Sequence, residues 1–163
     1  MPLAVTHILL PIILVDTFRD HFLKKKKILS NRLILFAGLA GLLPDIDLPI
    51  SLLLGVDLHR TITHSIIFPL MFLILAGILY FRKNKVYFKI SLMFFIGFSI
   101  HLILDIIFGE VYFLFPFSFE GYYFDLTHLS NVYVQELYAM LDAVLLFFWL
   151  IHEELEHKIK DYL

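Results

Sequence analysis

The chain has 163 residues, of which 60% are hydrophobic and 17% aromatic, and its formal net charge is -2. Soluble domains of this size rarely have such a composition, so we expect a single integral membrane domain over residues 1–163. The small net charge, with no alternation of cations and aromatics on a polar face, argues against a nucleic-acid partner. The chain has no cysteine, which excludes disulfides and thiolate metal sites.

Apolar stretches long enough to cross a hydrocarbon core, which takes about 20 helical residues, recur along the chain. They predict an all-α polytopic transmembrane helical bundle of about five spans. The first stretch lacks a basic leading segment and a small-residue cleavage site, so we expect it to belong to the mature protein. The predicted spans are Leu3–Phe22, Leu33–Val56, Ile62–Phe81, Tyr87–Phe108 and Val132–Ile151.

The second predicted span carries two prolines close to two carboxylates, in Pro44-Asp45-Ile46-Asp47-Leu48-Pro49. Proline lacks the backbone N–H that an α-helix needs, so this helix should be broken at Pro44-Asp45-Ile46-Asp47. The carboxylates and the freed backbone groups can then turn toward a polar cavity instead of lipid.

Lysine and arginine collect on the cytoplasmic side of membrane proteins, which makes them a test of orientation. Except for Arg60, they all lie in three segments: residues 19–32, residues 82–89 and the tail after residue 157. With five spans, all three segments fall on one side if the N-terminus is extracytosolic. We therefore predict a multi-pass cell-membrane protein with a cytoplasmic C-terminus.

Seven histidines and aspartates from four predicted spans fall at a similar depth in the outer half of the membrane. By helical rise, those inside the spans lie about 18 to 27 Å from the cytoplasmic end. Each unpaired buried charge costs several kcal/mol unless a cation compensates it, so packing alone explains such a set poorly. We predict metal binding by His7, Asp45, Asp47, His59, His64, His101 and Asp105.

Local spacing supports this prediction. His101 and Asp105 are four residues apart, so they share one helix face and can bind one ion together. His59 and His64 bracket the start of the third span, where Thr63 or Ser65 can cap the helix and orient a histidine. Glu136 reaches the same level and is either a late ligand or base, or an ordinary interface residue.

The motifs resemble those of the YdjM-type (LexA-regulated) membrane-bound metal-dependent hydrolase family. The resemblance is carried by Thr6-His7-Ile8-Leu9, Leu43-Pro44-Asp45-Ile46-Asp47, His59-Arg60-Thr61-Ile62-Thr63-His64-Ser65, His101 with Asp105, and Phe115-Pro116-Phe117-Ser118. It departs at Thr61, where the family usually has glycine, and at Leu48, where the family has histidine. The resemblance implies membrane location, a divalent metal and hydrolysis.

The leading hypothesis is a hydrolase of a lipid or lipid-linked phosphoester, similar to phospholipases and phosphatases. Histidine and aspartate suit Zn²⁺, with Mn²⁺ as the alternative, and seven candidate ligands make one or two ions plausible. Arg60 can grip a phosphate or pair with a carboxylate, and Asp47 is a second catalytic candidate. Membrane lipid is the expected partner, and the pattern makes no prediction of oligomeric state.

Two other functions use the same residues. A metal-ion or proton transporter would have a transit site beside a broken helix, although no internal repeat is present. A structural protein would hold a fixed metal, usually with four ligands.

Overall fold

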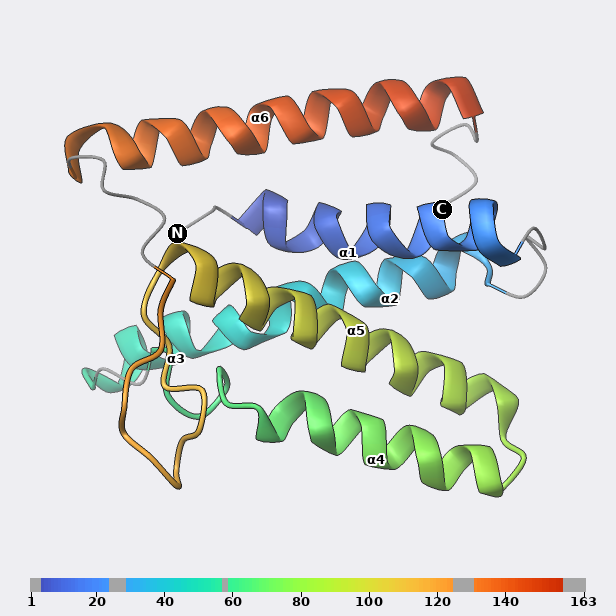
Figure 1. The fold of residues 1–163 in the computed structure, drawn as a ribbon, viewed down its shortest axis with the longest axis horizontal. Coiled ribbons are helices and arrows are strands. Elements are labelled where there is room, and N and C mark those ends of the chain that lie inside the picture. Colours follow the sequence, from blue (N-terminus) through green and yellow to red (C-terminus); the bar gives the residue numbers. More distant parts are fainter. Residues whose placement is uncertain (1–3, 24–28, 57–58, 125–130, 157–163) are drawn as a thin grey trace.

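The computed structural model describes residues 4–23, 29–56, 59–124 and 131–156, and all its regular elements are helical (Figure 1). A single isolated bridge pairs Val111 with Tyr122. The elements are α1 (Ala4–Phe18), the π-helical turn η1 (Arg19–Leu23), α2 (Asn31–Leu42), the 3-10 turn η2 (Leu43–Ile46), α3 (Asp47–Leu54), α4 (Ile67–Phe81), α5 (Lys85–Phe108) and α6 (Asn131–Glu156).

The helical fold class is confirmed, and within the described ranges two helical segments are long and apolar enough to cross a membrane. These segments are Asn31–Leu54, which joins α2, η2 and α3, and Lys85–Phe108, which is α5. Helix α4 is apolar but shorter. It begins at Ile67 and not at the predicted Ile62, because the preceding residues form turns that bond to other segments.

The predicted break in the second span is confirmed as an interruption of α-helical geometry. Residues Leu43–Ile46 form a 3-10 turn in which Pro44 occupies the first turn, where its missing N–H costs no hydrogen bond. The chain then continues as α3 until Gly55, which closes the helix in the left-handed conformation with φ of 64°. Asp45 therefore lies in a tightened turn in the middle of the apolar segment, and Asp47 lies directly after this turn, at the start of α3.

Helices α1, α2 and α5 pack together in the interior, and two glycines let their backbones approach closely. A Cβ at Gly41 would stand 2.1 Å from the His7 carbonyl oxygen, and one at Gly97 would stand 2.3 Å from the Ala37 carbonyl oxygen. Any side chain at either position would push the helices apart. The apolar core beside them contains Leu9, Ile12, Val15, Leu29, Ile34, Ala37 and Met93.

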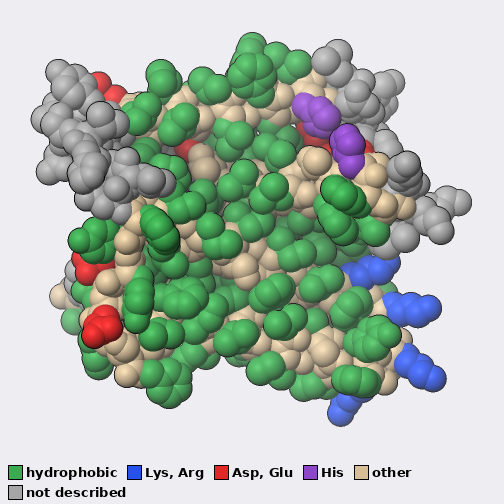
Figure 2. All heavy atoms as spheres, viewed as in Figure 1, with side chains coloured by type: hydrophobic (Ala, Val, Ile, Leu, Met, Phe, Trp, Pro, Cys, Tyr) green, Lys and Arg blue, Asp and Glu red, His purple; other side chains and the backbone are tan. Residues whose placement is uncertain are grey.

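The outer surface is largely apolar, and charge gathers at the ends of the helices. Figure 2 shows hydrophobic side chains over most of the visible face, with Lys and Arg side chains at the end where α4 turns into α5. Leu52 and Phe81, on α3 and α4, are 85% and 83% exposed. Apolar exposure on this scale suits lipid contact better than contact with water.

The aromatic segment after α5 folds back beside the start of α4. Val111 and Tyr122 exchange backbone hydrogen bonds of 3.0 and 2.9 Å, and the amide of Ile66 donates to the Phe113 carbonyl oxygen at 3.0 Å. The Ser65 hydroxyl donates to the Phe115 carbonyl oxygen. Residues 59–66 and 109–124 thus lie together at the α3 end of the bundle (Figure 1).

Candidate metal centre

Four elements bring the predicted histidines and aspartates together. His7 comes from α1, Asp45 and Asp47 from η2 and the start of α3, and His101 with Asp105 from α5. His59 and His64 come from the turns that precede α4. The side chains of His7, Asp47, His64, His101 and Asp105 are all buried inside the bundle.

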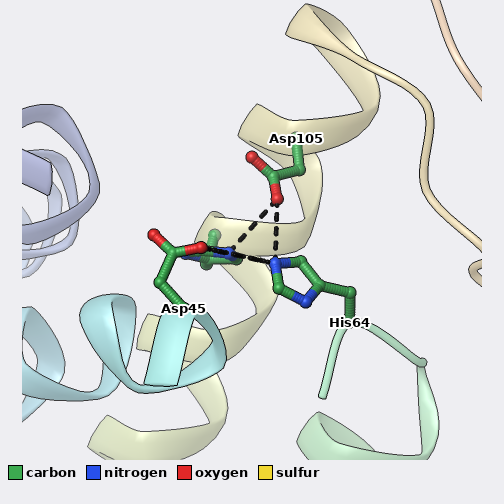
Figure 3. Close-up of side chains that lie close together, drawn as sticks. Asp45, His64 and Asp105 are labelled. Carbon is green, nitrogen blue, oxygen red and sulfur yellow. Dashed lines mark hydrogen bonds and ion pairs between the residues drawn. The ribbon is translucent and has the colours of Figure 1, made fainter. Parts of the chain in front are cut away.

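The inner part of this group is a compact set of four ligand-type atoms. The Nε2 atoms of His64 and His101 are 3.1 Å apart. The Asp105 Oδ2 atom lies 3.2 Å from the first and 3.3 Å from the second, while Asp45 Oδ1 lies at 3.5 and 3.7 Å. Figure 3 shows the labelled Asp45, His64 and Asp105 pointing toward one another. We call Asp45, His64, His101 and Asp105 the inner cluster.

The spacing and the buried carboxylate oxygens of the inner cluster both fit a divalent ion. Ligands about 2.0–2.1 Å from a tetrahedral zinc ion stand about 3.3–3.4 Å from one another. Asp45 Oδ1 and Asp105 Oδ2 are buried, and the imidazole nitrogens of His64 and His101 approach them at 3.2 to 3.7 Å. Buried carboxylate oxygens are costly unless a donor or cation satisfies them, and these two face the shared centre.

Each inner histidine uses its second nitrogen to fix its orientation. The Nδ1 atom of His101 lies 2.7 Å from the Gly41 carbonyl oxygen, so it carries the proton of the neutral ring and leaves Nε2 free to bind an ion. The Nδ1 atom of His64 lies 3.1 Å from Asp47 Oδ2. A carbonyl or carboxylate behind the ring is the usual support of a metal-binding histidine.

Asp47 is the centre of an outer hydrogen-bond network. Its Oδ1 atom lies 2.9 Å from His59 Nδ1, and its Oδ2 atom accepts from the Arg60 amide at 3.1 Å and from the Thr63 hydroxyl at 2.6 Å. Asp47, His59 and His64 form a second group close enough to hold an ion. However, His64 faces this group through Nδ1 and faces the inner cluster through Nε2.

His7 reaches the inner cluster from the α1 side. Its Nε2 atom lies 3.2 Å from Asp105 Oδ1, the carboxylate oxygen that faces away from His64 and His101. The His7 and His101 rings lie against each other, with centroids 4.3 Å apart. His7 thus contacts a candidate ligand, while the four converging atoms come from other residues.

The Arg60 side chain lies against the end of α5. Its Nη1 donates to the Glu110 carbonyl oxygen at 2.9 Å, and its guanidinium occupies the space that a side chain at Gly109 would need. Its Nε is buried and without a hydrogen-bond partner in the protein. The residue has a φ of 61°, which places its backbone N–H against Asp47.

The carboxylates around His64 change its basicity. Burial lowers the pKa of the His64 imidazole, but hydrogen bonds to Asp105, Asp45 and Asp47 outweigh that effect and raise the pKa to about 10. The metal-free cluster therefore stabilises a cation at this position, because the surrounding negative charge favours the protonated ring.

Three other polar residues lie outside the inner cluster. Asp142 accepts hydrogen bonds from the Thr6 amide and hydroxyl, which ties α6 to α1. Glu136 is exposed. Asp16 pairs with Arg19. Glu153 is buried close to Asp16 and His152, and these three residues form a further group that could hold an ion. The sequence does not predict this burial, because Glu153 falls in a charged tail.

The supporting carbonyl oxygens of Gly41 and Glu110 are also missed by sequence reasoning, since backbone acceptors leave no residue signature. Gly41 is a helical glycine close to the break in the second span. A glycine at such a position is the sequence feature that could have indicated close contact between two helices.

The regular elements of the described residues are helical, the exterior is apolar, and a histidine and carboxylate cluster is buried inside, which is typical of a helical membrane protein with a polar site in its interior. The sequence matches the family described as YdjM inner membrane protein over residues 1–157, and the chain belongs to that family. No curated protein and no solved structure matches the chain.

Proposed function

We propose that the protein is a membrane-embedded, divalent-metal-dependent hydrolase of a lipid or lipid-linked phosphoester. The observation that carries this proposal is the inner cluster, in which two imidazole nitrogens and two buried carboxylate oxygens face one centre. Histidine with carboxylate, and no thiolate, is a donor set suited to Zn²⁺ or Mn²⁺.

His64, His101 and Asp105 would hold the ion, because their facing atoms form the tightest triangle, with sides of 3.1 to 3.3 Å. Catalytic zinc sites usually have three protein ligands and an open fourth position. Asp45 stands at the fourth corner, at the longer distances of 3.5 and 3.7 Å, and its side chain is 18% exposed. This corner is the most accessible part of the inner cluster.

One ion suits the cluster better than two. A neutral His64 ring offers one lone pair, and its Nδ1 is engaged with Asp47 while its Nε2 faces the inner cluster. Asp47 and His7 then act as hydrogen-bond supports for His64 and Asp105, and His59 acts as a support for Asp47. Such supports typically change metal affinity about 10- to 100-fold.

A bound divalent ion would supply an acidified water and would stabilise negative charge on a phosphoryl oxygen. The chain's own groups divide the remaining work. Asp45 would accept the proton of the attacking water, since its carboxylate lies at the accessible corner. Arg60 would donate from Nε to a phosphate oxygen, because this donor has no partner in the protein and Nη1 is already bound to Glu110.

The membrane placement follows from the same proposal. Five crossings, with the cluster in the outer half and the N-terminus outside, put the α4–α5 turn with Arg82, Lys83 and Lys85 on the cytoplasmic side. Residues 59–66 and 109–124 would then face outward and border the site. A membrane lipid could reach this position without crossing the bilayer.

A structural metal site is the second candidate, and it is favoured by the presence of four protein groups around one centre. A transporter has weaker support. Buried apolar side chains, including Leu9, Ile12 and Val15, fill α1 between the inner cluster and the buried Asp16 near the opposite end. This apolar core separates the inner cluster from Asp16 along the helix.

The Asp45→Asn variant separates the enzyme from the structural site. In the enzyme, the variant keeps one equivalent of metal and loses turnover by about 10²- to 10⁴-fold, the usual contribution of a general base. In a four-ligand structural site, the variant loses metal as well. Metal content and hydrolysis are measured on the same preparation, with the exposed Glu136→Gln as the matched control. Hydrolysis is followed as phosphomonoester formed from phospholipid micelles and as inorganic phosphate released from polyprenyl phosphate micelles.

A further inference from the structure

A long apolar groove on the outside of the bundle ends at the inner cluster. It has a cavity volume of about 520 Å³ and is lined by Phe36, Leu39, Leu43, Ile46 and Phe94, with Asp45 as its one charged residue. Leu39 and Ile46 are 56% and 51% exposed, so the groove is open along its outer side. We call it the α2 groove.

The dimensions of the α2 groove suit a hydrocarbon chain. Its wall from Phe36 to Ile46 covers about 15 Å by helical rise. This length is about half the thickness of a hydrocarbon core of about 30 Å, so an extended acyl segment can lie along the wall. The volume falls within the range of about 300–1,000 Å³ that is typical of small-molecule sites, and the apolar lining with one polar end is the usual composition of such sites.

The polar end of the groove links it to the chemistry. Asp45 lines the groove, and its Oδ1 atom belongs to the inner cluster, 3.5 Å from His64 Nε2. A molecule with an apolar tail in the groove would therefore place its polar end at the accessible corner of the cluster. A lipid has this chemistry, whereas a soluble phosphoester would leave the apolar wall unused.

We propose that the α2 groove binds one acyl or prenyl chain of the substrate, so that a lipid enters the site sideways from the bilayer with its headgroup at Asp45. This inference rests on the proposed hydrolase function. It adds that the substrate is selected by its hydrocarbon chain and not by its headgroup alone.

A second groove supplies a matched control. It has a volume of about 420 Å³ and is lined by apolar residues that include Leu14, Phe18, Leu92 and Met93, together with Lys89. None of its lining residues belongs to the inner cluster. Leu14 is 49% exposed, close to the 56% of Leu39, so a tryptophan at either position fills an open groove at similar structural cost.

The first experiment is photolabelling. Wild-type protein is placed in vesicles of phosphatidylethanolamine and phosphatidylglycerol that contain a trace of phosphatidylglycerol with a diazirine at the end of one acyl chain. We expect residues 36–49 to be labelled more than the fraction of probe among the bilayer lipids would give by chance. Leu39→Trp should reduce this labelling severalfold. Leu14→Trp should leave it unchanged. Labelling of both grooves in proportion to the probe would identify ordinary boundary lipid and overturn the inference.

The second experiment is kinetic and uses long-chain and short-chain esters with the same headgroup. Leu39→Trp should lower the ratio of their kcat/KM values by about tenfold or more, because even one methylene in an apolar pocket is worth roughly that factor. Leu14→Trp should leave the ratio unchanged, and an unchanged ratio in Leu39→Trp would contradict the inference. Failure of the hydrolase proposal shows separately, as a wild-type protein that hydrolyses neither ester, and the photolabelling still decides the groove.

Discussion

Replacement of Gly97 by alanine should separate α5 from α2 and weaken the metal centre without touching a candidate ligand. The new Cβ would stand 2.3 Å from the Ala37 carbonyl oxygen, where about 3.4 Å is an ordinary contact, so the helices must separate by about 1.1 Å. His101 lies one turn further along α5, and its 2.7 Å hydrogen bond to Gly41 would lengthen toward 3.8 Å. Hydrogen bonds of that length are effectively lost.

The expected cost of Gly97→Ala is about 1–3 kcal/mol of stability, as for other overpacked cores. Metal affinity should fall about 10- to 100-fold, because the support behind His101 is lost. Thermal unfolding and metal titration of detergent-solubilised protein measure the two effects. Gly77→Ala is the matched control, since a Cβ at this helical position meets nothing within 4 Å. Wild-type metal affinity in Gly97→Ala would show that the Gly41 carbonyl oxygen does not support the metal centre in this way.

Three further outcomes are expected. Arg60→Lys should retain metal and stability but lose turnover on phosphoesters, since lysine keeps the charge without the planar fork, and equal loss of metal would exclude the phosphate-binding role. The His64 pKa is raised to about 10, from about 6.5 in an unfolded chain. The contribution of the protonated His64 ring to the stability of chelator-treated protein should therefore be complete below about pH 6.5 and lost as the pH rises through 10. Unfolding temperatures across this range, with His64→Gln as the control, measure the loss; a wild-type curve that matches the control would contradict it. Single cysteines at Glu120 and Lys83 should react with an impermeant thiol reagent on intact cells at Glu120 only, and the reverse pattern would invert the orientation.

Much of the fold follows from residue patterns that report directly on backbone chemistry. The prolines at 44 and 49 predict the interruption of the second helix, because a missing N–H acts locally whatever surrounds it. The spacing of His101 and Asp105 predicts one shared helix face. The extent of α4 is not predictable in this way, since the turns from His59 to Ile66 depend on partners about 50 residues later in the chain.

The proximity of the seven candidate residues can be predicted from the sequence, but the arrangement of their side chains cannot. All seven predicted residues gather at one end of the bundle, since helical rise places them at one depth. Their division into converging atoms and supporting groups depends on side-chain direction. Asp47 contacts Nδ1 of His64 and Asp45 approaches Nε2, although the two carboxylates are only two residues apart. The Gly41 carbonyl oxygen enters the site through close helix packing, which composition does not encode.

Elemental analysis of the purified protein shows whether the inner cluster holds a divalent ion. We expect one equivalent of Zn²⁺ or Mn²⁺ per chain in the wild type. We expect none in His101→Ala, and full retention in His21→Ala, whose histidine is exposed and lies outside the cluster. A wild-type protein that remains metal-free after incubation with either ion, or a His101→Ala variant that retains it, would contradict the account.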